Sequence, residues 1–195
     1  MRIGVTGIFA SGKGTVCSIF KDLGAIVIDT DILAREIVMP GSPALDKIKN
    51  AFGDDYFNED GSLQRREFAQ YVFDDPQKVE TLNGITHPAI LDIMMNRSSD
   101  NEIYMIDTPL LFESGFDTYM DKTIVVKAQR SQAVNRGVKR DGITAEEIEN
   151  RLKFQIPLNE KEKRADYVID NSESLDNTKR QVVDLWKILK ELQEK

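Results

Sequence analysis

Short apolar runs separated by longer polar and amphipathic stretches dominate the pattern of this chain. The runs lie at residues 2–6, 25–29, 103–106, 123–126 and 167–169. Within each run the apolar positions are nearly continuous instead of alternating, which is typical of parallel strands covered on both faces. With helices between them, the runs predict a doubly wound α/β domain.

The stretches between the runs carry helix signals. The first run is followed, after a glycine-rich turn, by a segment in which apolar side chains have helical spacing. Thr144 and Glu147 form a capping-box pattern with an isoleucine on each side, so we expect a helix from Thr144 to near Ile156. One apolar stripe over residues 175–195 predicts a closing helix.

Residues 7–15 read Gly-Ile-Phe-Ala-Ser-Gly-Lys-Gly-Thr. The pattern G-x-x-x-x-G-K is that of a phosphate-binding loop, whose glycines let backbone N–H groups turn toward a polyphosphate while Lys13 reaches the outer phosphates. The N-terminus of the following helix adds its partial positive charge. The sequence therefore predicts a nucleotide site that contains Ala10, Ser11, Gly12, Lys13, Gly14 and Thr15.

Carboxylates follow two of the predicted strands. Asp29 and Asp31 come after the second run, and in an extended chain both side chains project to the same side. Asp31 is the candidate base for an attacking hydroxyl, with helix capping as the alternative role. Asp107 ends the third run, where phosphate-loop enzymes carry an acidic residue near Mg²⁺. Because Gly14 replaces the usual Mg²⁺-binding serine or threonine, the candidate metal residues are Asp107 and Thr15.

An anionic ligand needs locally gathered cations, because the net charge of the chain is −7. Arg136 and Arg140 lie four residues apart and share one face if their segment is helical. Arginine suits phosphoryl transfer because its planar donors stabilise charge on the transferring group, whereas an exposed basic face is the alternative. Arg65 belongs to a second basic group, and His87, the single histidine, has a structural role as its alternative.

Residues 40–100 differ from the rest because they show helical patterns and turn signals without a convincing central strand. Breaks are expected at Asp75-Pro76 and at His87-Pro88. We expect a mostly helical insertion here. An insertion into a nucleotide-binding domain is where we expect the second substrate to bind.

The composition, with 41% hydrophobic residues in a chain of 195, fits a globular protein with one domain and an inserted subdomain. No apolar run approaches the roughly 18 residues that a membrane span needs, and no signal pattern is present. The acidic balance argues against broad nucleic-acid binding. Since Cys17 is the single cysteine, no internal disulfide is expected. We therefore expect a cytoplasmic protein without a nucleic-acid or membrane partner.

Taken together, these segments resemble dephospho-coenzyme A kinase over essentially the whole chain. The stretches that match in order and spacing are residues 5–13, 29–36, 40–45, 63–65, 72–73, 85–88, 107–113, 136–141, 155–157, 161, 165–166 and 169–171. The resemblance implies Mg²⁺-dependent transfer of the γ-phosphoryl group of ATP to the ribose 3′-hydroxyl of dephospho-coenzyme A, the last step of coenzyme A biosynthesis.

The same resemblance implies a phosphate-loop kinase fold, with a five-stranded parallel sheet flanked by helices, a helical substrate-binding insertion and a small lid. The core would take residues 1–39 and 101–195, the insertion 40–100, and the lid 136–157. The protein would be a monomer or a small homo-oligomer.

Three groups of residues match functional positions of that family. The catalytic group comprises Lys13, Asp31 and Arg140. The group that binds ATP comprises the loop residues with Arg136, Arg140 and Asn171, the last near the adenine. The group that binds the acceptor comprises Asp31, Arg65 and His87.

Two other functions stay open. The Gly-Lys-Gly-Thr ending of the loop is similar to that of adenylate kinases, which makes a nucleoside monophosphate kinase the runner-up. The Asp-Thr-Asp and His-Pro segments match the coenzyme A enzyme instead. A nucleotide-binding switch without turnover is the third interpretation, and the Asn-Lys-x-Asp segment of its guanine-binding form does not occur in the sequence.

Overall fold

The structure is a computed structural model that describes residues 1–194. It divides the chain into two compact units, each with its own internal packing. The first combines the stretch from Met1 to Asp29 with the stretch that begins at Ser98, and the second is Thr30–Arg97. The proposed functional boundaries at residues 40 and 100 stay a prediction, whereas the compact inserted unit begins directly after the second strand.

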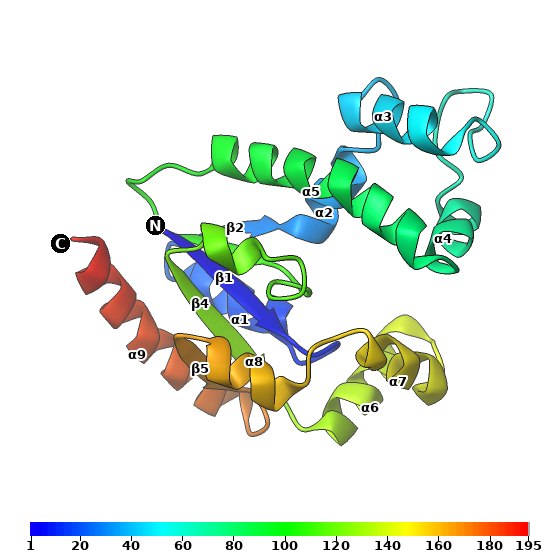
Figure 1. Cartoon of the computed structure of the whole chain (residues 1–195). Helices are drawn as coiled ribbons and strands as arrows, with labels where there is room; N and C mark the ends of the chain where they lie inside the picture. Colours follow the sequence, from blue (N-terminus) through cyan, green and yellow to red (C-terminus); the bar gives the residue numbers. More distant parts are fainter. Residues whose placement is uncertain (195) are drawn as a thin grey trace. The chain divides into compact units, whose positions relative to one another are not determined.

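The first unit alternates strands and helices (Figure 1). Its strands are β1 (Arg2–Gly7), β2 (Ile26–Asp29), β3 (Tyr104–Asp107), β4 (Lys122–Lys127) and β5 (Tyr167–Asp170). Its helices are α1 (Lys13–Asp22), the 3₁₀ helix η1 (Phe116–Tyr119), α6 (Arg130–Asp141), α7 (Ala145–Lys153), α8 (Leu158–Arg164) and α9 (Leu175–Gln193).

The five strands form one parallel sheet with the order β2-β3-β1-β4-β5, which confirms the prediction from the apolar runs. The central strand β1 pairs with β3 on one side and with β4 on the other. In this register Asp107 lies opposite Asp29 on one neighbour and opposite Val5 on the other. The carboxyl ends of β1, β2 and β3 therefore meet at one edge, where ligands bind in open α/β sheets.

Both faces of the sheet are covered, which explains the continuous apolar runs. Ile3 and Val5 are fully buried in a core cluster with residues of α1 and α9, such as Phe20. Gly4 points to the other face, where a Cβ atom would lie 2.7 Å from Leu111. Successive residues of a strand face opposite sides, so a strand covered on both sides has no polar face.

The second unit is helical. Its helices are α2 (Thr30–Glu36), α3 (Pro43–Phe52), α4 (Arg65–Phe73) and α5 (Pro76–Arg97). The long helix α5 packs against the other three, with Met94 fully buried. The break expected at Asp75-Pro76 is confirmed, since α4 ends at Phe73 and α5 begins at Pro76, where proline is favoured as the first helical residue.

The break predicted at His87-Pro88 was wrong, because α5 continues through Pro88. Proline removes one hydrogen bond from a helix interior but does not end a helix that is held by tertiary packing. In contrast, the capping box at Thr144 and Glu147 is present. Helix α7 ends at Lys153, slightly earlier than expected.

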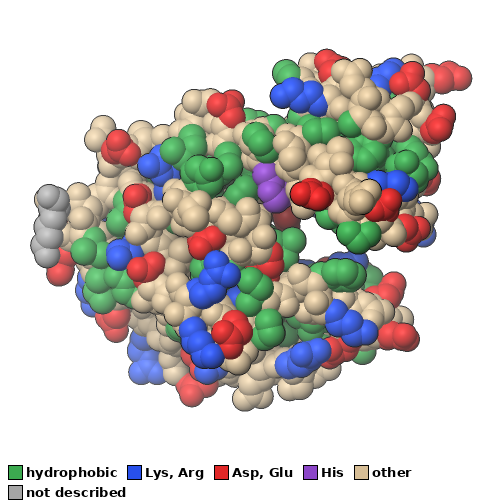
Figure 2. Space-filling view, viewed as in Figure 1, with side chains coloured by type: hydrophobic (Ala, Val, Ile, Leu, Met, Phe, Trp, Pro, Cys, Tyr) green, Lys and Arg blue, Asp and Glu red, His purple; other side chains and the backbone are tan. Residues whose placement is uncertain are grey.

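Charged side chains of both signs are intermixed over the face shown in Figure 2. On this face the acidic side chains are therefore not gathered in one patch. Among the described residues, no helix has both the length and the apolar character that crossing a membrane requires.

Candidate active site: the phosphate loop and its supports

The loop between β1 and α1 has an unusual backbone. Ala10 has a φ of 56° and is the single described residue other than glycine with positive φ, while Gly12 has a φ of 96°. The Ser11 amide donates to the Ile8 carbonyl at 3.1 Å, which closes the turn. Left-handed residues cost free energy and are retained where the surroundings hold them, often at ligand sites. This loop is held in that way.

The N-terminus of α1 is open to an anion. Gly12 caps it without a side-chain hydrogen bond, and its first turn contains no acidic residue. The first N–H groups of a helix have no partner within the helix, so they attract negative charge. Within residues 1–194, no hydrogen bond or ion pair occupies the Lys13 ammonium. This arrangement suits the phosphates of a nucleotide.

Two side chains fix the loop through the Ser11 carbonyl. The Asn171 Nδ2 group donates to it at 2.8 Å, and an Arg136 guanidinium N–H donates to it at 3.3 Å. Thr178 orients the Asn171 amide by donating to its Oδ1 at 2.9 Å. Ser11, Asn171 and Thr178 are all buried. The loop is thus tied to α6, to α9 and to the end of β5.

Gly12 is required by this arrangement. A Cβ atom at Gly12 would lie 2.1 Å from Asn171 Nδ2. Because Asn171 is held at both ends of its amide, it is not free to rotate away. Glycine is therefore needed at position 12 for two reasons: its backbone is left-handed, and the Asn171 side chain leaves no room for a Cβ atom.

Arg136 and Arg140 lie in α6, so the helical condition for their shared face is met, but they make different contacts. Arg136 binds the carbonyls of Ser11 and Asn171. Arg140 forms two hydrogen bonds with the Asp141 carboxylate at 2.7 and 2.8 Å, which raise the pKa of Arg140 and lower the pKa of Asp141. The Arg140 side chain is 63% exposed. Arg136 serves the loop, whereas Arg140 stays accessible.

The segment formed by α6 and α7 contacts the loop through Phe9. The Phe9 amide donates to Gln155 Oε1 at 2.9 Å, so this loop N–H is already used by the protein. The guanidinium groups of Arg140 and Arg151 lie 5.3 and 5.4 Å from the Phe9 ring centre. Beside them, Ile8 shares a small buried cluster with residues of both helices. Movement of these helices is therefore mechanically linked to the loop.

A buried ion pair joins α8 to the segment that follows β3. Lys161 in α8 is fully buried, and its Nζ is 2.8 Å from Glu113 Oε1 and 3.2 Å from the Pro109 carbonyl. Burial lowers the pKa of Lys161, and the Glu113 carboxylate partly opposes that effect. Thr6 of β1 also donates to the Pro109 carbonyl. The pair thus fixes the chain that leaves β3 after Asp107.

Asp107 and Asp29 meet at the carboxyl edge of the sheet, as Cα partners on neighbouring strands. Mg²⁺ in nucleotide enzymes commonly takes one or two carboxylates together with phosphate oxygens and water. No group of three or more metal-binding side chains occurs among the residues that the structure describes. The pair of carboxylates therefore fits an ion that the nucleotide shares. Thr15, which lies in the first turn of α1, is exposed.

The three residues expected to bind the acceptor lie in the second unit. Asp31 is exposed in the first turn of α2, so the expectation of an extended Asp-Thr-Asp segment was wrong at this residue. The helix begins directly at Thr30. The extended geometry that would project the Asp29 and Asp31 side chains to the same side is therefore absent. Arg65 donates to the Arg35 carbonyl at 2.9 Å. His87 is half-buried in α5, and this burial lowers its pKa.

Several supports of the site were not predicted from the sequence. They are Gln155, which holds the Phe9 amide, Thr178, which orients Asn171, and the pair of Lys161 with Glu113. Lys161 and Glu113 lie in polar stretches, where such residues are usually exposed. The two are also distant from each other in the sequence, so no local pattern indicates that they pair. The single available signal is that Gln155, Lys161 and Glu113 fall within matched stretches of the resemblance.

Comparison with known proteins gives a consistent result. A family model described as dephospho-CoA kinase matches residues 1–177. A dephospho-CoA kinase from Syntrophotalea carbinolica is 43% identical over 188 residues, covering 94% of this chain and 89% of the relative. One from Listeria innocua is 39% identical over 186 residues, covering 93% of each chain.

Solved structures agree with the fold. A crystal structure from Thermus thermophilus superposes with a TM-score of 0.84 at 30% identity and covers 97% of each chain. A dephospho-CoA kinase from Campylobacter jejuni has a TM-score of 0.62 at 24% identity, with 95% of each chain covered. A shikimate kinase from Aquifex aeolicus has a TM-score of 0.55 at 15% identity, with 99% covered. The last two support the phosphate-loop kinase fold alone.

Proposed function

Since the chain belongs to the dephospho-CoA kinase family and so catalyses ATP-dependent phosphorylation of dephospho-CoA, the final step of CoA biosynthesis, we propose which of its residues carry the reaction. The γ-phosphoryl group of ATP is transferred to the ribose 3′-hydroxyl of the acceptor. The observation that carries this proposal is the anchored left-handed loop, which presents an uncapped helix and an unoccupied Lys13 ammonium.

On the nucleotide side, the loop residues 10–15 bind the phosphates of ATP, and Lys13 neutralises their charge. Phosphoryl transfer depends mainly on positioning and on stabilising charge, so a protein needs few other groups. Arg140 adds a second cation, because it is exposed near the loop through its contact with Phe9. Arg136 and Asn171 contribute by holding the loop, with Asn171 on the adenine side.

On the acceptor side, Asp31 accepts the proton of the attacking hydroxyl, while Arg65 and His87 bind the acceptor. Asp31 suits a base because it is exposed and lies two residues after the carboxyl end of β2. The lowered pKa of His87 keeps its ring mostly neutral at neutral pH. We therefore assign hydrogen bonding to His87 and electrostatic attraction to Arg65.

Mg²⁺ fits the carboxylates at the sheet edge, with Asp107 as its main protein partner and Thr15 as the nearest hydroxyl after the missing serine. When bound, the ion neutralises phosphate charge. Residues 136–157 act as the lid that excludes water, which would otherwise compete as acceptor. We place the functional acceptor region at residues 40–100, the protein in the cytoplasm, and its assembly at monomer or small homo-oligomer.

The test of the function is ADP release from purified protein with MgATP and dephospho-CoA, AMP or no acceptor, together with mass analysis of the product. With MgATP, we expect ADP release only when dephospho-CoA is the acceptor, together with a product that is one phosphate heavier than dephospho-CoA. Release with AMP alone would instead support a monophosphate kinase. ATP binding without release would support a switch.

The same assay tests Asp31. Asp31→Asn removes the base but keeps the shape, so kcat is expected to fall by about 10² to 10⁴. Binding of ATP should not change. Asp46→Asn, another acidic residue in the first turn of a helix of this unit, is the matched control and should keep normal turnover. Normal turnover of Asp31→Asn would remove Asp31 from the mechanism.

A further inference from the structure

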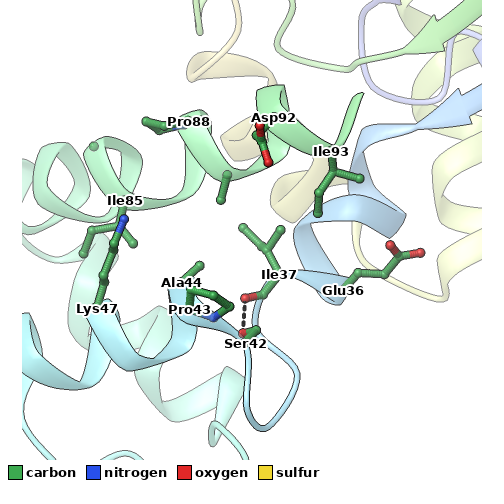
Figure 3. Close-up of a pocket in the computed structure, with 12 residues that line it drawn as sticks. Glu36, Ile37, Ser42, Pro43, Ala44, Lys47, Ile85, Pro88, Asp92 and Ile93 are labelled. Atoms are coloured by element: carbon green, nitrogen blue, oxygen red, sulfur yellow. Dashed lines mark hydrogen bonds between the residues drawn. The ribbon is translucent and has the colours of Figure 1, made fainter. Parts of the chain in front are cut away.

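The second unit contains a pocket that is lined by none of the residues given a role above. Figure 3 shows it between one face of α5 and the segment that joins α2 to α3. Its volume of about 580 Å³ lies within the range of small-molecule sites. The Ser42 hydroxyl donates to the Ile37 carbonyl and accepts from the Leu45 amide, so two hydrogen bonds hold the segment opposite α5.

One wall of the pocket offers a backbone acceptor. Gly84 and Pro88, one helical turn apart, both line it. Because Pro88 has no N–H group, the Gly84 carbonyl lacks the donor that its helical position would normally supply. Gly84 also has no side chain, and a Cβ atom built on it would meet nothing within 4 Å. The Gly84 carbonyl therefore lacks its usual helical donor, and the missing side chain leaves room for a ligand beside it.

The charges around the pocket disfavour an anion. Glu36 is paired with Arg97 at 2.6 Å. Among the described residues, neither Lys47 nor Asp92 has an ion-pair partner, and these two carry opposite signs. Apolar side chains such as Ile37 and Ile93 supply much of the remaining surface (Figure 3). A neutral ligand with methyl groups and amide N–H groups suits this chemistry better than a phosphate does.

We propose that this pocket binds the pantetheine arm of the acceptor. This inference rests on the proposed function, since the acceptor carries such an arm, which is uncharged and contains methyl groups and amides. The methyl groups pack on the apolar surface, and an amide N–H donates to the Gly84 carbonyl. Glu36 at the pocket and Asp31 lie on the same helix, about 8 Å apart along its axis. An acceptor that contacts both passes around this helix, because residues five positions apart lie on different faces of it.

The proposal is tested by filling the pocket. Gly84→Leu places a side chain in open space and replaces a poor helix former with a good one, so thermal stability should not fall. The Kd of dephospho-CoA should rise about tenfold or more, because the arm loses its site. The Kd of ATP and the kcat at saturating acceptor should change by less than about twofold. Gly84→Ala should give a smaller effect, and Asn83→Leu, one residue away and outside the pocket, should bind as the wild type does.

The outcomes separate the pocket from the function. If the wild-type protein does not phosphorylate dephospho-CoA, the proposed function fails whatever the variants do. If the wild type is active and Gly84→Leu binds dephospho-CoA normally, the pocket assignment fails and the function stands. AMP, which lacks the arm, serves as a second probe through inhibition. A loss of AMP inhibition as large as the loss of dephospho-CoA affinity would place the nucleoside in the pocket and overturn the proposal.

Discussion

At the residue scale, Gly12 joins the backbone of the phosphate loop to the side chain that anchors it. Gly12→Ala forces a left-handed φ of 96° on a residue with a Cβ atom and pushes that atom against Asn171. The two effects together should lower the free energy of unfolding by about 2 to 5 kcal/mol. Chemical denaturation measures this loss, and ATP affinity should fall with it.

Gly41→Ala is the matched control. Gly41 also has a positive φ, of 83°, but a Cβ atom there would meet nothing within 4 Å. This variant should lose about 1 to 2 kcal/mol, the cost of the backbone alone. If both variants lose the same amount, the contact with Asn171 does not constrain the loop.

Arg140 is the second residue whose contacts make a specific prediction. Arg140→Ala removes an exposed guanidinium near the loop without disturbing the carbonyl contacts of Arg136. We expect kcat to fall by about 10³ or more, because such arginines stabilise the charge on the transferring group. The Kd of ATP should change far less. Single-turnover rates and equilibrium binding measure the two quantities separately.

Arg130→Ala provides the comparison for Arg140. Arg130 begins the same helix and pairs with Glu149 on the surface. Loss of an exposed pair should cost at most about 1 kcal/mol of stability and leave kcat unchanged. A kcat for Arg140→Ala within tenfold of the wild type would contradict the catalytic role of Arg140.

At the scale of elements, the first turn of α1 has a glycine where most phosphate loops have a serine or threonine after the lysine. Gly14 lies in its first turn, and a Cβ atom there would meet nothing within 4 Å. Gly14→Ser should therefore be tolerated and should stabilise the helix by about 0.5 kcal/mol. It also supplies the hydroxyl that most phosphate loops place after the lysine. The Mg²⁺ concentration for half-maximal rate should fall.

Two readouts check the Gly14→Ser prediction. Thermal unfolding without ligand measures the effect on the helix, and the further rise in Tm with MgATP measures binding without turnover. An unchanged Mg²⁺ dependence of the rate, together with an unchanged rise in Tm with MgATP, would mean that the hydroxyl at position 14 does not reach the ion. Thr15 and Asp107 would then remain the candidates.

The strands were predictable because their signal is local. Each buried parallel strand is a short apolar run, and all five runs became strands. The capping box of α7 is equally local, since its two residues contact each other three positions apart. The loop pattern likewise indicated phosphate binding from one contiguous stretch of residues.

The predictions from sequence were wrong or incomplete where contacts between distant parts of the chain determine the local structure. Pro88 did not end its helix, because packing against three other helices stabilises α5. Asp31 entered a helix at once, although its sequence suggested an extended segment. Lys161 and Glu113 are 48 residues apart, so no local pattern reveals that they pair. Loop supports such as Thr178 are hidden for the same reason.

At the scale of the whole molecule, burial of one thiol makes stability depend on pH. Cys17 lies in the main core cluster, and burial, helped by the Asp107 carboxylate, raises its pKa. Above its ordinary pKa of 9.0, the unfolded chain loses the thiol proton and the folded protein keeps it. Unfolding is therefore favoured as pH rises, by about 1.4 kcal/mol per unit at most.

The contribution of Cys17 is isolated by measuring the free energy of unfolding of the wild type and of Cys17→Ala. The measurements run from about pH 8 to about pH 10.5, on both sides of the ordinary pKa of a thiol. Other groups, such as Lys161 with its lowered pKa, change both proteins alike and cancel in the difference. The wild type should lose stability faster with rising pH than the variant. Parallel curves would show that Cys17 ionises in the folded protein.

The strand order has a consequence for synthesis on the ribosome. The first strand made, β1, is the central one, and both of its neighbours, β3 and β4, come after residue 103. Helices α2 to α5 are complete by Arg97, and their contacts with one another lie within the unit Thr30–Arg97. The nascent chain therefore holds its first strand without hydrogen-bonding partners until more than half of the protein has been translated.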